Sequence, residues 1–212
     1  GVALATVFAA AGGAVAATAT ASTTPAPDHT LPANTRFAVT LPSEASQQAV
    51  TYLGQHDLAD AALMAKLASY PEAPWFTSGT PDHVRKAVQQ TMASARIQHA
   101  VPVLVAYDIP ARDCSQYSAG GAATDAAYQQ WISAFAAGIG TGKAVVVVEP
   151  DALGNLPSNC GGFGTAAYPF TDADRIAEVS SAVTALEKAP GTLVYLDGTN
   201  SHWQSVGGIT QR

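Results

Sequence analysis

Short apolar runs alternate with amphipathic stretches along most of the chain. The runs VPVLVAY (101–107), KAVVVVE (143–149) and TLVYLD (192–197) are apolar almost throughout, and PWFTS (74–78) is a shorter one. Apolar runs of this length, rich in β-branched residues and separated by turn residues, are typical of buried strands. The pattern therefore predicts at least these four strands.

Helical periodicity fills the stretches between the predicted strands. Helices are expected over 57–69, from Thr80 as N-cap with Pro81 in the first position, over 125–139, and from about Asp172 with Thr171 as cap. Apolar strands that alternate with amphipathic helices indicate a parallel sheet covered on both faces. The strand spacing fits a barrel or an open doubly wound sheet, and periodicity does not separate the two.

The ends of the chain suggest three segments. Residues 1–21 form a run of small apolar residues with A-x-A sites near its end, which predicts a secretory signal peptide without its start. An N-terminal membrane anchor is the alternative. Residues 22–36 are rich in Pro and Thr and predict an extended leader, and 37–212 are expected to form one folded domain that stops abruptly.

Composition narrows the choice of partner. The chain has 10 Lys and Arg against 16 Asp and Glu, a net charge of −6, and contains no basic run. Nucleic acids and anionic membrane surfaces are therefore excluded as partners. Only 12% of the residues are charged, and a surface of small neutral polar groups suits an uncharged ligand.

Two cysteines, Cys114 and Cys160, are the only ones in the chain. If the signal peptide directs export, the two thiols are expected to form a disulfide. Two reduced, buried thiols are the alternative.

Carboxylates follow three of the predicted strands. Asp108 and Asp113 follow the strand at 101–107, Glu149 and Asp151 end or follow the strand at 143–149, and Asp197 ends the strand at 192–197. Because parallel strands bring their carboxyl ends to one rim, where α/β proteins place their active sites, these side chains are expected to converge.

Three interpretations of the carboxylates compete. The first is a metal site, which is disfavoured because no His or Cys stands at ligand spacing near these carboxylates. The second is capping of the following helices, which explains any one Asp taken alone better than three together. Nucleophilic Ser catalysis and phosphate binding lack their motifs. Paired carboxylates at adjacent strand ends are instead what hydrolysis of a glycosidic bond requires.

Aromatic residues support a carbohydrate ligand. Trp75, Tyr107 and Trp203 all lie at or just beyond strand ends, where flat rings can stack on the apolar faces of sugars. Trp131 lies in the middle of an amphipathic helix, so it is expected to pack in the core.

The segments VAYDIPARDCSQYSAGG (105–121) and VVVVEPDALG (145–154) resemble the two most recognisable motifs of glycoside hydrolase family 6, the cellulases. YLDGTNSHW (195–203) and PWF (74–76) resemble further conserved regions. The resemblance implies an α/β fold, a distorted and partly open parallel β/α barrel that is incomplete at the C-terminus. It also implies an enzyme that hydrolyses β-1,4-glucan with inversion and with no metal or organic cofactor. With the predicted signal peptide and the acidic composition, we expect a secreted monomer without stable membrane association.

The resemblance also implies roles for individual residues. Asp151 is expected to be the general acid, and Asp113 to raise its pKa and take part in the proton path through water. Tyr107 is expected to press on the sugar ring at the cleavage point and Arg112 to support the carboxylates. Further substrate contacts are expected from Asp197, Trp75, Trp203, Ser118 and Asn200, with Cys114 and Cys160 as a disulfide that pins the loops.

Two positions depart from the family pattern: Asn200 stands where relatives often have His, and Ala119 where a water-positioning Ser is often found, with Ser118 adjacent. The compact stretch between Asp113 and Asp151 resembles open-cleft endoglucanases, which favours endo action. A cellobiohydrolase of the same family, or a non-catalytic carbohydrate-binding protein on the same scaffold, is the alternative.

Overall fold

The computed structural model describes residues 30–160, 170–200 and 202–212. Its centre is a parallel sheet of four strands in the order β1 (Trp75–Phe76), β2 (Val103–Ala106), β3 (Ala144–Val148) and β4 (Thr192–Leu196). All neighbouring strands pair in parallel, so the strands predicted from the apolar runs are confirmed. The predicted signal peptide lies outside the described residues.

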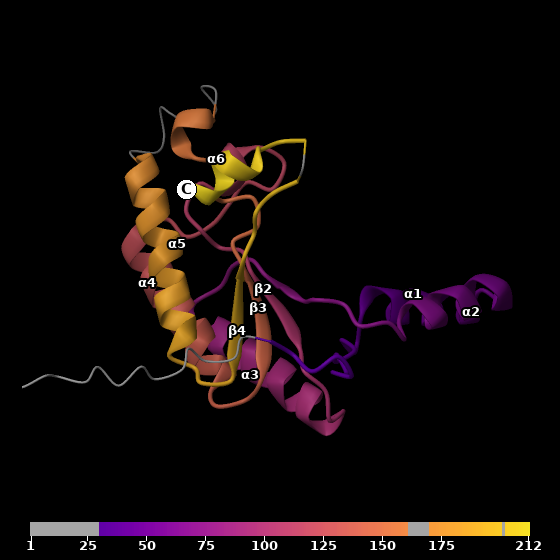
Figure 1. Ribbon diagram of the computed structural model, residues 1–212. Helices are drawn as coiled ribbons and strands as arrows, with labels where there is room; N and C mark the ends of the chain where they lie inside the picture. Colours follow the sequence, from indigo (N-terminus) through magenta and orange to yellow (C-terminus); the bar gives the residue numbers. More distant parts are fainter. Residues whose placement is uncertain (1–29, 161–169, 201) are drawn as a thin grey trace, which may run out of the picture.

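The strands lie in the sheet in the same order as in the sequence. Because crossovers between parallel strands are right-handed, an order that never reverses places the connecting helices on one face, as in a barrel wall. A doubly wound sheet would reverse its order, so the strand order decides between the two architectures that periodicity left open. Figure 1 shows β2, β3 and β4 with the helices that follow the strands.

Three helices follow the strands and start where their caps predict. They are α3 (Pro81–Ile97), α4 (Asp125–Ile139) and α5 (Asp172–Glu187). In each case a threonine hydroxyl accepts a hydrogen bond from a backbone N–H in the first turn, which fixes the start of the helix.

The core lies between these helices and one face of the sheet. It joins Val88 of α3, Trp131 and Phe135 of α4 and Ala182 of α5 to alternate strand residues such as Val146. Figure 1 shows α4 and α5 side by side along the sheet. The expectation of helices on both faces was wrong, because apolar strands are equally suited to a barrel whose second face points inward. The prediction that Trp131 packs in the core is confirmed.

The remaining elements are short or lie at the margin. The helices α1 (Glu44–Gly54) and α2 (Leu58–Leu67) contact each other and project away from the sheet in Figure 1. Sequence analysis missed α1, in which Ala49 is the only buried residue. The 3₁₀ turns η1 (Arg112–Ser115) and η2 (Pro157–Asn159) and the helix α6 (Val206–Thr210) complete the described structure. None of the helices in the described ranges has the length and apolar character that crossing a membrane requires.

Candidate functional site

The loops after β2, β3 and β4 meet at the carboxyl end of the sheet. The backbone N–H of Asp151, after β3, donates a 2.7 Å hydrogen bond to Oδ2 of Asp197, after β4. Cys114, after β2, forms a disulfide with Cys160, after β3. The predicted convergence of the carboxylates and the predicted disulfide are both confirmed.

Asp113 lies in a turn with an unusual backbone. Ala111, Asp113, Cys114 and Ser115 all have φ between 49° and 60°, a left-handed conformation that L residues seldom adopt. The carboxylate accepts a 2.7 Å hydrogen bond from the backbone N–H of Ser118. Left-handed backbone at non-glycine residues clusters at functional sites, which makes this turn a candidate catalytic element.

Arg112 holds this turn against the end of β1. Its Nη1 donates to the carbonyl oxygens of Thr77 at 2.6 Å and Tyr107 at 2.7 Å, and its Nε donates to the carbonyl of Ser118 at 2.7 Å. The guanidinium carbon also lies 4.8 Å from the centre of the Tyr107 ring. Its nearest described carboxylate contact is Asp108, at 3.9 Å. Arg112 therefore acts mainly on backbone carbonyls and an aromatic ring.

Asp151 is a half-buried carboxyl with the environment of an acid. Partial burial raises its pKa above the ordinary value, and the negative charges of Asp197 and Asp113 raise it further. A raised pKa keeps the proton on the carboxyl at higher pH, as a general acid requires. Like Asp113, Asp151 has a left-handed backbone, with φ 66°.

Two exposed aromatic rings contact the loops that follow β2 and β3. Trp75 at β1 is 55% exposed and meets Tyr107 edge to face, with 5.3 Å between ring centroids. Trp203, after β4, is 40% exposed and lies against Gly154, where an added Cβ would approach the indole ring to 2.9 Å. Tyr107 is buried and is hydrogen-bonded to Ser118, and burial raises the pKa of its phenol.

Two predicted contact residues also have structural partners. The Asn200 side-chain oxygen accepts from the N–H of His202 at 3.1 Å, and its backbone carbonyl accepts from the N–H of Trp203. Asn200 thus shapes the loop that carries Trp203. Ser118 is exposed beside Asp113 and Tyr107.

Sequence analysis missed one residue of this region. Glu149 was noted as a carboxylate after a strand but was not assigned a role, and it is 1% exposed. Its carboxylate accepts hydrogen bonds from the N–H groups of Asp108 and Ile109 and from the Tyr128 hydroxyl. Burial nevertheless raises its pKa to about 7. Its burial distinguishes Glu149 from the half-buried Asp113, Asp151 and Asp197, and burial depends on segments distant in sequence.

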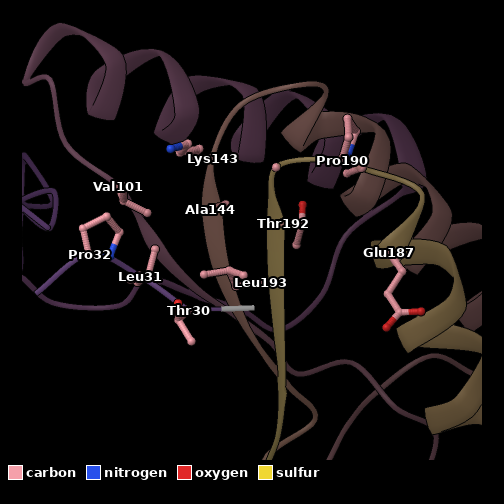
Figure 2. Close-up of a pocket in the computed structure, with 12 residues that line it drawn as sticks. Thr30, Leu31, Pro32, Val101, Lys143, Ala144, Glu187, Pro190, Thr192 and Leu193 are labelled. Carbon is pink, nitrogen blue, oxygen red and sulfur yellow. The ribbon is translucent and has the colours of Figure 1, made fainter. Parts of the chain in front are cut away.

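A cavity of about 670 Å³ opens at the opposite end of the sheet. Figure 2 shows Lys143, Thr192 and Leu193 lining it beside Leu31 and Pro32. Lys143 precedes β3, and Thr192 and Leu193 begin β4. The cavity therefore lies away from the end of the sheet where α/β enzymes place catalytic groups. Within the described ranges, no cluster of three His, Cys, Asp or Glu side chains is arranged to hold a metal ion.

Comparison with known proteins agrees with this geometry. The model of the family described as glycosyl hydrolases family 6 matches residues 32–210. The chain belongs to this family. Endoglucanase 1 from Streptomyces halstedii is 36% identical over 154 residues, which cover 72% of this chain and 45% of that protein.

Solved structures show the same fold in other members of family 6. The endoglucanase Cel6 from Mycobacterium tuberculosis superposes with a TM-score of 0.72 at 32% identity, over 84% of this chain and 57% of that one. The endoglucanase Cel6B from Humicola insolens, at 21% identity, supports the fold alone, with a TM-score of 0.65 over 84% of this chain and 57% of that one. The α/β fold with its distorted barrel architecture is thus confirmed. The chain spans about half the length of these relatives.

Proposed function

We propose that the protein hydrolyses β-1,4-glucosidic bonds of cellulose-type glucans with inversion of configuration, and that Asp151 is the general acid. The observation that carries this proposal is the partly buried carboxyl of Asp151 beside Asp113 and Asp197, whose charges raise its pKa. Exposed Trp75 contacts Tyr107, and exposed Trp203 lies against Gly154, which follows Asp151 in the same loop. In the proposed complex these two rings are the platforms on which sugar rings stack.

In the proposed reaction, Asp151 donates its proton to the glycosidic oxygen as the bond to the anomeric carbon breaks. Water attacks that carbon from the opposite face and loses its proton through water toward Asp113. Tyr107, whose phenol pKa is raised by burial and by the charges of both Asp113 and Asp151, contacts the ring at the cleavage point in this proposal. Because the attack is a single displacement, the new reducing end is an α anomer.

The relatives support the substrate class. The Mycobacterium tuberculosis endoglucanase was solved in complex with methyl-cellobiosyl-4-deoxy-4-thio-β-D-cellobioside, a glucan analogue with a sulfur-containing linkage. Endo action is proposed because this enzyme and the Streptomyces halstedii relative are both endoglucanases. The short stretch between Asp113 and Asp151 is also compatible with an open cleft.

Export and a monomeric state complete the proposal. A disulfide between Cys114 and Cys160 persists in oxidising compartments outside the cytosol, which supports a secreted protein. A monomeric state is proposed with it. No metal or organic cofactor has a part in the proposed reaction.

The test uses the longest natural form of the protein that carries this sequence, with a soluble β-1,4-glucan as substrate. Reducing sugar and viscosity are followed together, and the product anomer is read by proton NMR. The proposal expects an early fall in viscosity and α-anomeric product. A β-anomeric product would refute inversion, and retention on cellulose without sugar release would indicate a non-catalytic binding protein. Slow viscosity loss with steady sugar release would refute endo action.

A further inference from the structure

The segment Asp108–Pro110 connects β2 to the turn that carries Asp113. It has no strand pairing of its own, yet buried charged side chains bind its backbone. The Glu149 carboxylate accepts the N–H of Asp108 at 3.1 Å through Oε1 and the N–H of Ile109 at 3.0 Å through Oε2. One side chain at the end of β3 thus fixes two consecutive peptide groups after β2.

A second charged side chain holds the next residue of this segment. Arg175 in α5 is 2% exposed, and its Nη2 donates a 2.6 Å hydrogen bond to the carbonyl of Pro110. Its Nε lies 3.3 Å from Oε2 of Glu178, which is also 2% exposed and whose pKa burial raises to about 8. The segment is therefore held from β3 on one side and from α5 on the other.

The turn that follows needs such support. Four of the five residues from Ala111 to Ser115 are left-handed without being glycine. A backbone of this kind persists only where its surroundings determine it fully. The Cys114–Cys160 disulfide holds the far end of the turn, and Glu149 and Arg175 hold the near end.

Stability alone is a weak reason to bury these charges, because well-packed apolar groups of similar size usually stabilise a protein as well as a buried ion pair does. What apolar groups cannot do is fix individual N–H and C=O groups in place. We propose that Glu149 and Arg175 are positioning residues, which hold the Asp108–Pro110 backbone so that Tyr107 and Asp113 keep their reactive placement. This inference rests on the proposed function.

The main variants are Glu149→Gln and Glu149→Asp. Gln keeps the shape but has only one accepting oxygen, so it cannot serve both N–H groups as the carboxylate does. Asp keeps the charge but is one methylene shorter, so its oxygens withdraw from the segment. Tyr128→Phe is the matched control, since it removes only the hydroxyl that donates to Glu149 at 3.0 Å and leaves both backbone contacts intact.

Kinetics are measured well below each variant's unfolding midpoint. Both Glu149 variants are expected to lower kcat by about 100-fold, as a small misplacement of reacting groups does. KM should stay within about twofold, because Trp75 and Trp203 are untouched. Arg175→Lys, which keeps a charged donor, should retain more activity than Arg175→Gln. Loss of kcat in Glu149→Gln but not in Glu149→Asp would overturn positioning in favour of a charge effect.

Amide hydrogen exchange is a second measurement, and it does not depend on hydrolysis of the substrate. The N–H groups of Asp108 and Ile109 should exchange at least about tenfold faster in both Glu149 variants than in Tyr128→Phe. Unchanged exchange would overturn the inference. If the unmodified protein does not hydrolyse glucan, the proposed function fails, and the exchange rates still decide whether Glu149 holds the segment.

Discussion

Removing the Cys114–Cys160 disulfide should cost a large part of the stability of the fold. The two cysteines are 46 residues apart. For a loop of this length, the chain-entropy model gives an entropy change of about 13.5 cal/mol/K, or about 4 kcal/mol at 25 °C. Single domains have unfolding free energies of about 5–15 kcal/mol, so the double variant Cys114→Ala/Cys160→Ala should remain folded but be markedly weakened.

Urea denaturation followed by tryptophan fluorescence measures this loss. With an m value near 2 kcal/mol/M, the midpoint should fall by about 2 M. The unmodified protein in a strong reductant should show a similar fall, and the double variant should not respond to the reductant. A loss below about 1 kcal/mol would refute the view that the bond stabilises the fold by restricting the unfolded chain.

Three further predictions concern the site and its surroundings. Asp197→Asn removes a charge that raises the pKa of Asp151, so the basic limb of the kcat/KM profile should move to lower pH; an unmoved limb would contradict the assigned coupling. Burial raises the pKa of Asp108 from 3.8 to about 7, so its contribution to the unfolding free energy is full below about pH 4 and is lost as pH rises through 7. In Asp108→Asn, the fall in unfolding free energy between pH 5 and 7 should therefore be shallower than in the unmodified protein, by up to about 1.4 kcal/mol per pH unit. An equal slope in the two proteins would show that the carboxyl is ionised throughout this range. Gly121 has φ 95°, and an added Cβ would overlap a backbone carbonyl oxygen in the segment after β2, so Gly121→Ala should destabilise by about 3 kcal/mol in thermal unfolding; the control Gly54→Ala, with nothing within 4 Å, should not.

Much of the fold follows from local sequence. Threonine caps predicted the helix starts at Pro81 and Asp172, helical periodicity predicted the helix from Asp125, and the apolar runs predicted the strands. These features depend on neighbouring residues, so one segment is enough to recognise them. The side of the sheet that the helices cover depends instead on the order of the strands in space, which the apolar pattern does not contain.

The site divides in the same way. The convergence of Asp113, Asp151 and Asp197 follows from parallel strand ends. The contacts of Glu149 and Arg175 could not be predicted, because a Glu or Arg in sequence is equally compatible with a solvated surface position. Asp197 also contacts Asp151 through a backbone N–H, a contact that residue types alone do not suggest.

The assignment of Asp151 as general acid can be tested by varying the leaving group. Asp151→Asn is compared with the unmodified protein on a cello-oligosaccharide and on its 2,4-dinitrophenyl glycoside, whose leaving group needs no proton. General acid catalysis contributes about 100- to 10,000-fold, so the variant should lose activity to that extent on the oligosaccharide and far less on the dinitrophenyl glycoside. Equal losses on the two substrates, or no loss on either, would contradict the assignment.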